Sequence, residues 1–403
     1  MKNQDNHNTA DNVPQLRFPE FTGEWEMKKL GEVCEIIGGG TPETSVDEYW
    51  NGTIQWFTPT EIKSDYVSKS IRTITELGLQ KSSAKKLSIG TILLTTRASI
   101  GEASIALEEC TTNQGFQSLI AKKGINNIYI FNWIKKNKYE LTSRANGSTF
   151  LEVSKSEIEK IPIPIPTLPE QTKIANFFTA VDEKLQALKT KKRLLQQYKK
   201  GVMQQLFSQQ LRFKNDNGKE FPKWEMKDGN GIFDAISNKN HDSDLPILAI
   251  SQEFGAVPRE MINYQISVTE KSIDSYKVIE VGDFIISLRS FQGGIEFSKY
   301  KGICSPAYII LRNSIPINSL FYKEYFKTDF YIQKLCEKLE GIRDGKMISY
   351  KYFSDIKLPY PSLPEQTLIA NFLSSLDEKI NSTENQIQKT QAWKKGLLQQ
   401  MFV

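Results

Sequence analysis

The feature that most constrains the fold of this chain is a stretch of sequence that occurs twice. Residues 168–208 begin Leu-Pro-Glu-Gln-Thr, and residues 363–403 begin with the same five residues. The two stretches align without a gap, and close to half of the aligned positions are identical. A shorter repeat, Trp-Glu-Met-Lys, starts at Trp25 and again at Trp224. Repetition of this kind indicates an internally duplicated chain, which we expect to fold as two related halves.

Each long copy reads as a single helix. Apolar residues recur at alternating steps of four and three, which is a heptad pattern. Polar residues at Lys192, Thr383 and Thr390 interrupt the pattern, which favours two unlike helices that select one partner and one register. Packing of each helix on its own globular neighbour is the alternative. The apolar positions are Ile174, Phe178, Val181, Leu185, Leu188, Leu195 and Val202 in the first copy, and Ile369, Leu373, Leu376, Ile380, Ile387 and Leu397 in the second.

The sequence between the helices forms two blocks that differ at most positions but share a skeleton. Strand-like runs precede a helical run in each block, at 128–142 and 320–339, so we expect an α+β domain in each half. The predicted fold class is α+β, with two such domains joined by two long antiparallel helices that form a coiled-coil spacer, and with an internal pseudo-two-fold repeat. The predicted boundaries are a flexible N-terminal tail at 1–16, a first domain at 17–167, a helical spacer at 168–213, a second domain at 214–362 and a second helical spacer at 363–403.

Composition limits the class of protein only loosely. The 403 residues carry a net charge of +5, which is compatible with nucleic acid as a partner but does not establish it. No apolar run approaches the length of a membrane span, so we expect a cytoplasmic protein. The cysteines form no C-x-x-C pair and are interpreted as reduced packing residues: Cys34, Cys110, Cys304 and Cys336.

Catalytic and cofactor signals are weak. His7 and His241 are the two histidines, which excludes a histidine cluster for metal binding or acid–base catalysis. Gly341–Lys346 resembles a phosphate loop but has the wrong spacing and lacks the required Ser or Thr. Gly38–Gly40 is typical of a tight turn, with close approach to a phosphate as the alternative. We therefore expect no cofactor, no metal and no catalytic residue on this chain.

Two arginines are the candidates for contacts to DNA. Arg97 and Arg289 have matched spacing to glycines in the two blocks, and each lies near amide or hydroxyl side chains. Arginine pairs with guanine, and Asn or Gln pairs with adenine, in direct readout of base edges. A structural ion pair is an alternative role for either arginine. The candidate set is Arg97, Thr96 and Gln114 in the first block, and Arg289, Ser290 and Gln292 in the second.

These features together resemble the specificity subunit of type I DNA restriction-modification systems. The resemblance rests on Leu168–Gln171 and Leu363–Gln366, on Trp-Glu-Met-Lys at the block starts and on the order of blocks and helices, and it covers nearly the whole chain from Phe18. It implies two target recognition domains that each read one half of a bipartite site in double-stranded DNA. It also implies that the helices set the gap and dock two methyltransferase subunits, and that restriction/translocase subunits join this core.

The resemblance places the chemistry on partner subunits, which would bind S-adenosylmethionine, ATP and magnesium. A self-contained DNA methyltransferase or nuclease with a duplicated binding module is the alternative function, and a coiled-coil scaffold for two protein-binding domains is a third. The helix residues expected to dock partners are Glu170, Gln171, Phe177, Leu185, Glu365, Gln366, Phe372 and Ile380.

Overall fold

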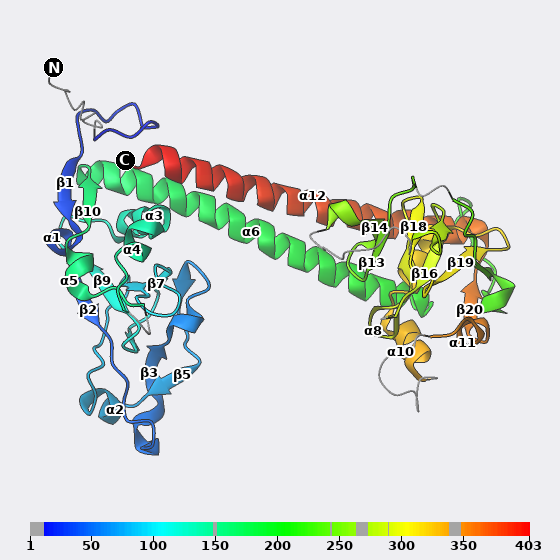
Figure 1. Ribbon diagram of the computed structural model, residues 1–403, viewed down its shortest axis with the longest axis horizontal. Helices are drawn as coiled ribbons and strands as arrows, with labels where there is room; N and C mark the ends of the chain where they lie inside the picture. The colour runs from blue at the N-terminus through cyan, green and yellow to red at the C-terminus, as the bar shows by residue number, and fades with distance from the viewer. Residues whose placement is uncertain (1–11, 148–150, 242–243, 263–272, 289, 338–347) are drawn as a thin grey trace. The chain divides into compact units, whose positions relative to one another are not determined.

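The computed structural model describes residues 12–147, 151–241, 244–262, 273–288, 290–337 and 348–403 (Figure 1). The chain divides into two compact units, which are described one at a time. The first unit comprises residues 1–189 and 385–403, and the second comprises residues 190–384. Each unit therefore contains one α+β domain together with a part of each of two long helices.

The two predicted long helices are α6 (Leu168–Phe207) and α12 (Leu363–Met401). Within the first unit, Lys394 near the end of α12 forms an ion pair with Asp182 near the start of α6, so the helices run antiparallel. Within the second unit, Lys199 near the end of α6 pairs with Asp377 near the start of α12. The prediction of two α+β domains with paired long helices is confirmed.

The polar residues that interrupt the heptad pattern have partners. Thr383 is buried, and its Oγ1 donates a 2.7 Å hydrogen bond to the carbonyl oxygen of Lys379 one turn earlier. Lys192 of α6 forms a 2.6 Å ion pair with Glu384 of α12. The Thr383 hydroxyl is satisfied within α12 itself. The Lys192–Glu384 pair selects one register, because a shift of α12 along α6 would separate its two charges.

The domain of the first unit contains three sheets. A five-stranded sheet has the order β2-β9-β6-β7-β4, in which β4 and β7 are parallel and the other neighbours antiparallel. A three-stranded sheet has the order β5-β3-β8, and β1 pairs with β10. The elements are β1 (Glu26–Lys29), α1 (Leu30–Val33), β2 (Cys34–Gly38), β3 (Trp50–Phe57), β4 (Tyr66–Val67), β5 (Arg72–Ile74), α2 (Glu76–Gln80), β6 (Ile92–Leu94), β7 (Ala103–Ala106), β8 (Cys110–Thr112), β9 (Gln117–Ala121), α3 (Asn127–Lys136), α4 (Lys138–Thr142), α5 (Lys155–Glu159) and β10 (Pro162–Ile165).

The domain of the second unit repeats part of this plan. A four-stranded sheet has the order β12-β19-β16-β17, and β11 pairs with β20. Two further antiparallel pairs are the hairpin of β13 with β14 and the pair of β15 with β18, which are separated in sequence by β16, α8 and β17. The elements are β11 (Glu225–Asp228), β12 (Phe233–Ile236), β13 (Leu248–Ser251), β14 (Gly255–Pro258), β15 (Lys277–Ile279), β16 (Phe284–Ile286), α8 (Ser290–Gly293), β17 (Glu296–Phe297), β18 (Gly302–Cys304), β19 (Ile309–Asn313), α9 (Ser319–Tyr325), α10 (Asp329–Glu337), α11 (Tyr350–Ser354) and β20 (Lys357–Tyr360).

The proline-rich segment before each long helix forms an edge strand. Met27 of β1 lies opposite Pro164 of β10, and Met226 of β11 lies opposite Pro359 of β20. Prolines are tolerated in these strands because each belongs to a two-stranded sheet with a free edge. The Trp-Glu-Met-Lys repeat and the proline segments, far apart in sequence, therefore meet in the same way in both units.

The sequence predicted one continuous helix at 128–142 and one at 320–339, and the structure breaks both. In the first unit, Asn137 separates α3 from α4 with a φ of −101° and a ψ of 34°. Its Nδ2 donates a 3.0 Å hydrogen bond to the carbonyl oxygen of Trp133, so the side chain competes with the helical ladder. In the second unit α9 ends at Tyr325 and α10 begins at Asp329; residues 338 and 339 lie outside the described residues.

The long helices complete the core of each domain. In the first unit Phe178 of α6 and Phe402, just after α12, pack with the fully buried Tyr129 of α3. In the second unit Phe207 of α6 packs on Phe321 of α9. Each domain thus depends on both helices for its interior, and neither helix is an appendage.

A buried ion pair fastens each domain to the start of a long helix. Arg17 donates to both carboxylate oxygens of Glu170, at 2.7 and 2.8 Å, and the Trp25 indole N–H donates to the same carboxylate at 3.2 Å. Arg212 donates to both oxygens of Glu365 at 2.9 Å in the second unit. Both carboxylates are almost fully buried, so each needs its arginine to offset the loss of water.

We expect Arg17→Ala to lower the free energy of unfolding of the first unit by about 3–5 kcal/mol, since it leaves a buried charge without its partner. Urea denaturation measures the loss, and hydrogen exchange of peptides from β1 and β10 locates it. Arg193→Ala is the matched control, because that exposed arginine of α6 bonds only the amide of Gln197, at 3.0 Å, among its described contacts. Equal effects of the two substitutions would contradict the assignment.

Candidate functional site

The candidate Arg97 follows β6 and lies at the surface of the first domain. Its guanidinium forms a 2.7 Å ion pair with Glu152, and the two side chains are 44% and 34% exposed. Ser99, Lys138 and Leu151 line the shallow pocket around this pair. The structure thus places Arg97 in an ion pair, which was the alternative role for this residue. Because the Arg97 side chain is still exposed, its contact with DNA stays a prediction.

Thr96 and Gln114 lie in different environments. Thr96 is fully buried, and its hydroxyl lies 3.3 Å from the carbonyl oxygen of Gly115, to which it donates. Gln114 is exposed, and its Oε1 accepts a 2.6 Å hydrogen bond from the hydroxyl of Thr41. Gln114 is therefore accessible to a ligand, whereas Thr96 joins the segment after β6 to the segment before β9.

The candidate set of the second domain is only partly described. Arg289 lies outside the described residues. Ser290 is fully buried, and its Oγ accepts a 2.7 Å hydrogen bond from the backbone N–H of Ser287. Gln292, on the short helix α8, is exposed. Of the described members, Gln292 is the one available at the surface.

The glycine run at 38–40 packs closely against neighbouring backbone. A Cβ at Gly39 would lie 2.1 Å from the carbonyl oxygen of Asn113, and one at Gly40 would lie 2.2 Å from Oγ of Ser83. These contacts explain the glycines at 39 and 40 without a phosphate. The chain leaves β2 at Gly38 without forming a turn at 38–40, so the predicted tight turn is not found there. The segment Gly341–Lys346 lies outside the described residues.

Each unit contains a charge network between the long helices and the domain. In the second unit Lys199 of α6 contacts Asp377 of α12 and Glu324 of α9, each at 2.7 Å. Burial by itself raises the pKa of Asp377, but Lys199 and then Lys323 outweigh it and lower that pKa below its usual value. The carboxylate of Asp377 is thus stabilised in its charged form.

The equivalent network of the first unit has a different balance. Lys394 pairs with Asp182 and, at 3.4 Å, with Asp65, which Lys135 contacts at 2.7 Å. Here burial is the largest effect and raises the pKa of Asp182 in spite of Lys394. The repeat contains Asp-Glu-Lys at residues 182–184 and again at 377–379. The aspartate of each triplet thus lies in a partly buried contact between the helices.

The predicted docking residues divide into buried and accessible groups. Glu170 and Glu365 are held by the arginines described above. Gln171 accepts a 2.9 Å hydrogen bond from the backbone N–H of Asn126, the N-cap of α3. Gln366 makes the same contact with Asn318, the N-cap of α9, at 2.8 Å. These four side chains fasten each helix to its own domain, and Leu185 is also buried; Phe177, Phe372 and Ile380 are partly exposed.

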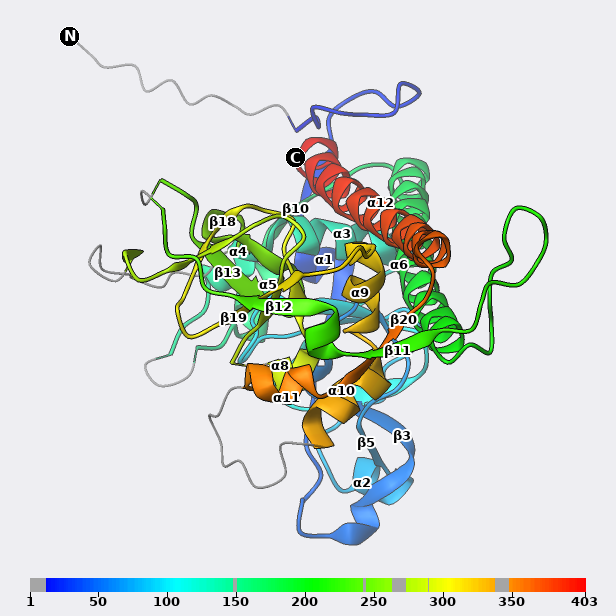
Figure 2. The same ribbon diagram turned by 90° about the vertical axis from the view of Figure 1, so that its right-hand side faces the viewer.

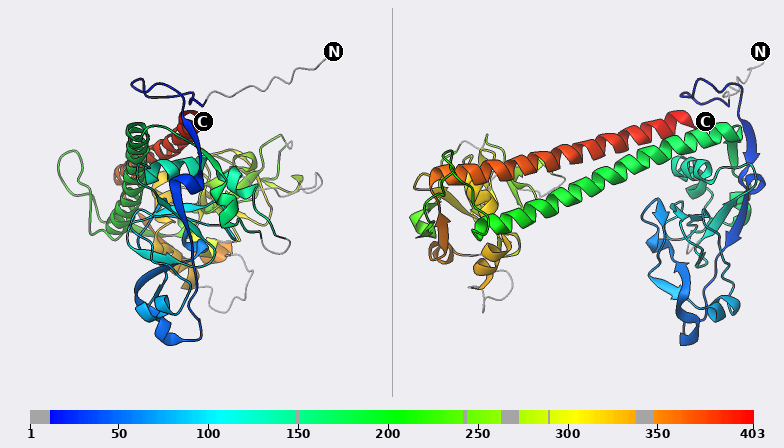
Figure 3. Two further views of the ribbon diagram at one scale, coloured as in Figure 1. Left: turned by 90° about the vertical axis from the view of Figure 1, so that its left-hand side faces the viewer. Right: turned by 180° about the vertical axis from the view of Figure 1, so that it is seen from behind.

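Sequence reasoning missed a third repeat. Gln-Leu-Arg-Phe occurs at residues 15–18 and again at 210–213, aligned with the long repeat. The backbone N–H of Leu16 donates to the carbonyl oxygen of Gln400 at 2.9 Å, so the start of the described chain lies beside the end of α12 (Figure 3). Leu211 makes the equivalent bond to Gln205 at 3.0 Å. Aligning the residues before each block would have revealed this repeat.

Two apolar surface patches result from the repeats. Patch 1 is defined as Leu16, Phe18, Phe177 and Trp393. Patch 2 is defined by the repeat as the residues at the equivalent positions, Leu211, Phe213, Phe372 and Tyr198. Phe177 packs edge-to-face on Phe18 and on Trp393, both at 5.9 Å between ring centroids, and Phe372 packs on Phe213 at 5.6 Å.

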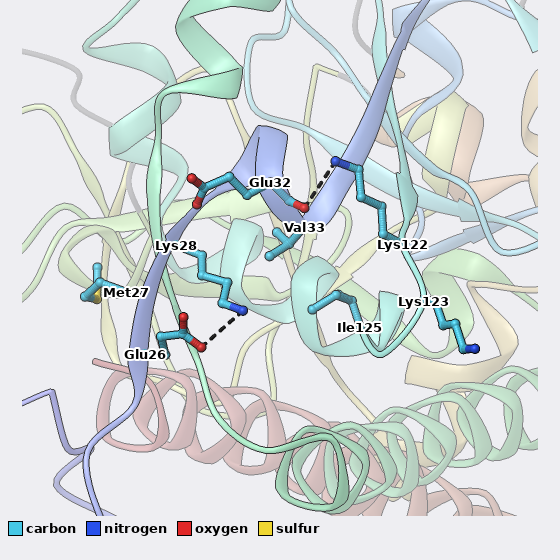
Figure 4. Close-up of a pocket in the computed structure, with 8 residues that line it drawn as sticks. All are labelled: Glu26, Met27, Lys28, Glu32, Val33, Lys122, Lys123 and Ile125. Atoms are coloured by element: carbon cyan, nitrogen blue, oxygen red, sulfur yellow. Dashed lines mark hydrogen bonds and ion pairs between the residues drawn. The ribbon is translucent and has the colours of Figure 1, made fainter.

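Exposure is matched between the two patches. Leu16 and Leu211 are 41% and 42% exposed, and Trp393 and Tyr198 are 51% and 55% exposed. Met27 and Met226, at the same position of the Trp-Glu-Met-Lys repeat in the two units, are also both exposed. Figure 4 shows Met27 beside the ion pair of Glu26 and Lys28. Large apolar side chains that stay exposed at equivalent positions of two diverged units indicate a binding surface for another molecule.

The described residues hold no group of three or more His, Cys, Asp or Glu that could bind a metal ion. Within the same described part of the chain, no helix is long and apolar enough to span a membrane. Burial raises the pKa of the thiols of Cys34, Cys110 and Cys304 to about 12, so these cysteines are protonated and unreactive at neutral pH.

Residues 22–197 and 214–391 match a family model described as the Type I restriction modification DNA specificity domain. The chain is 29% identical over 395 residues to the Type I restriction enzyme MjaIX specificity subunit of Methanocaldococcus jannaschii, which covers 90% of this chain and 89% of the relative. It is also 29% identical over 174 residues to the Type I restriction enzyme EcoR124I/EcoR124II specificity subunit of Escherichia coli, with coverage of 41% and 43%.

Two solved structures share the fold. One is the S subunit of a type I restriction-modification system from M. genitalium, with 16% identity, a TM-score of 0.59 and coverage of 97% of this chain and 99% of the other. The second comes from work on complex assembly and conformational transition of the type I R-M system, with 18% identity, a TM-score of 0.56 and coverage of 94% and 97%.

Proposed function

This chain belongs to the family of type I restriction modification DNA specificity domains. From that membership we propose a function for each α+β domain and for the paired helices. Each α+β domain reads one half of a bipartite site in double-stranded DNA, and the paired helices set the gap between the halves. The family is non-catalytic within its complex. Methyl transfer, ATP hydrolysis and cleavage therefore belong to partner subunits, with S-adenosylmethionine, ATP and magnesium bound there.

The observation that carries this proposal is a set of contacts that both units share, called the frame below. It consists of the arginine–carboxylate pairs, the pairing of β1 with β10 and of β11 with β20, and one tyrosine bond in each unit. Tyr129 and Tyr322 are equivalent buried residues, and each donates from its hydroxyl to a proline carbonyl of the edge strand, at 2.6 and 2.8 Å. Outside this frame the two domains differ in sheet content, with β5-β3-β8 in the first and two separate strand pairs in the second. Because the shared contacts are the same and the remaining strands differ, each domain can present a different surface to its own half of the DNA site. Such a role would place the chain in the cytoplasm with its DNA substrate.

For the partners, we propose that two methyltransferase subunits dock on patches 1 and 2, one on each. Matched exposure and the aromatic content of the patches support this, because aromatic side chains are enriched at interface hot spots. Restriction/translocase subunits would join the resulting core. The buried Glu170, Gln171, Glu365, Gln366 and Leu185 would act indirectly, by holding each patch in place, whereas Phe177 and Phe372 would contact the partner; Ile380 stays a prediction.

The isolated chain should retain DNA but transfer no methyl group, and addition of its methyltransferase subunit should produce methylation at one bipartite motif. Incorporation of methyl groups from labelled S-adenosylmethionine, followed by mapping of the modified bases, measures both. Methyl incorporation by the chain alone would instead support the self-contained methyltransferase. Absence of any defined motif with the partner present would overturn the specificity role.

Trp393→Ala and Tyr198→Ala should each weaken the binding of one methyltransferase subunit about tenfold or more, and the double substitution should weaken both. Native mass spectrometry would then count one bound subunit for each single variant and none for the double variant at a limiting concentration. Leu194→Ala is the control, because Leu194 is comparably exposed on α6 but has Lys389 as its counterpart in the repeat. Unchanged stoichiometry in the double variant would contradict docking at the patches.

Lengthening both helices by seven residues, after Leu188 and after Thr383, should widen the gap in the methylated motif by about three base pairs. Seven helical residues add about 10 Å, and duplex DNA rises about 3.4 Å per base pair. A four-residue insertion is the control, because it also rotates the helix beyond it by about 40° and breaks the heptad seam. A functional lengthened variant that still methylates the original spacing would show that the helices do not set the gap.

A further inference from the structure

The three-stranded sheet of the first domain forms a lobe with a small core of its own. Strands β3 and β5 lie together with α2 in this lobe (Figures 1 and 2). Its core is formed by Trp50, Ile54, Trp56, Ile74 and Ala84, which are all buried. Residues 225–392 contain no tryptophan, so the second domain has no equivalent of the tryptophan pair at 50 and 56.

Arg72 stacks on this tryptophan pair. Its guanidinium carbon lies 3.5 Å from the ring centroid of Trp50 and 6.0 Å from that of Trp56. The two rings meet edge-to-face at 5.1 Å. Their indole N–H groups donate to the carbonyl oxygens of Glu43 and Gly40, at 3.1 and 2.9 Å, so both rings are held in orientation. Arg72 therefore rests on a rigid aromatic platform.

The guanidinium of Arg72 is accessible to a ligand, and its N–H groups are available for hydrogen bonds. The residue is exposed, and within the described ranges it makes neither a side-chain hydrogen bond nor an ion pair, in contrast to Arg97 with Glu152. Stacking on an indole face uses the π surface of the guanidinium and leaves its N–H edge available. An arginine held in this way is ready to donate two parallel hydrogen bonds without first breaking an internal contact.

The backbone beside Arg72 is also held in place. Glu61 Oε1 accepts a 2.6 Å hydrogen bond from the N–H of Ile71, and Gln55 Oε1 accepts one of 2.8 Å from the N–H of Ser70. The hydroxyl of Ser70 donates to the carbonyl oxygen of Arg72 at 2.6 Å. These bonds present the side chain of Ile71 to solvent, where it is 85% exposed. The segment is thus ordered before any ligand binds, which lowers the entropic cost of binding.

We propose that Arg72 reads a base pair in the half-site of the first domain, donating both N–H groups of its outer edge to the O6 and N7 of a guanine in the major groove. Ile71 makes an apolar contact beside it, for which a thymine methyl is the matching group. This assignment rests on the proposed function of DNA recognition. Duplex DNA is the occupant because Lys63 and Lys69, which precede Arg72 in the chain, are exposed and can face phosphates, while the acidic Asp65 is paired with Lys135 and Lys394.

A phosphate contact by Arg72 is the competing role for the same chemistry. A phosphate contact contributes to all DNA sequences alike, whereas a base contact discriminates between base pairs. Lysine also separates the two roles, since it keeps the charge but cannot make the planar two-bond contact to guanine. Arg72→Ala and Arg72→Lys are therefore the informative variants.

The test uses the full chain assembled with its methyltransferase subunit. Modified bases are mapped across a genome for the parent chain, Arg72→Ala, Arg72→Lys and the control Lys81→Ala, which removes an exposed charge from the same lobe. We expect both Arg72 variants to lose discrimination roughly ten- to a hundredfold at one G·C position of one half-site. The second half-site, the gap and the pattern of Lys81→Ala should not change.

Three outcomes would overturn the assignment: an unchanged motif, weaker methylation at all sites with the motif intact, or full discrimination retained by Arg72→Lys. A thermal unfolding midpoint equal to that of the parent chain shows that a variant is folded, and Ile71→Ala gives a second, milder probe at the same segment. If the parent chain itself yields no defined motif, the proposed function fails first, so the two failures are distinguishable.

Discussion

The architecture of both units depends on a carboxylate buried at the start of a long helix. Glu170 and Glu365 belong to the first turn of α6 and α12, where the helix dipole already favours a negative charge. Arg17 and Arg212 reach these carboxylates from the segments before each domain. A single ion pair in each unit therefore links two parts of the chain that are distant in sequence. The neighbouring glutamines, Gln171 and Gln366, extend this link to the N-caps of α3 and α9.

The repeat made most of the architecture predictable. A heptad pattern gives the start, length and pairing of α6 and α12, because every turn contributes the same kind of residue to one face. The break between α3 and α4 was not predicted, since a single asparagine that bonds the preceding turn is a weak signal in sequence. The break between α9 and α10 was missed for the same kind of reason, because there a single threonine, Thr328, donates to the carbonyl oxygen of Tyr325. The inward direction of Glu170 was missed for a related reason: periodicity identifies a buried face, but it does not identify which charged residue finds a partner there.

The candidate site was less predictable than the fold. Matched spacing drew attention to Arg97 and Arg289, yet spacing says nothing of Glu152, which contacts Arg97 from a segment more than fifty residues away. Arg72 gave no signal at all, because its stack on Trp50 exists only once β3 and β5 pair. Thr96 was selected as a neighbour of Arg97, although it is buried and bonds the carbonyl oxygen of Gly115, which sequence spacing does not reveal. Contacts across strands therefore decide which polar residues can meet a ligand.

The equivalent hydroxyl bonds of Tyr129 and Tyr322 have a consequence for the evolution of such a chain. These bonds, with the arginine–carboxylate pairs, lie in the frame and not on the surfaces that differ between the domains. Substitutions on the lobe of β3 and β5 or on the hairpins of the second domain can therefore accumulate without unfolding the molecule. Selection for a new target acts on one domain while the other keeps its old preference. A duplicated frame thus lets two specificities drift apart at separate rates within a single gene.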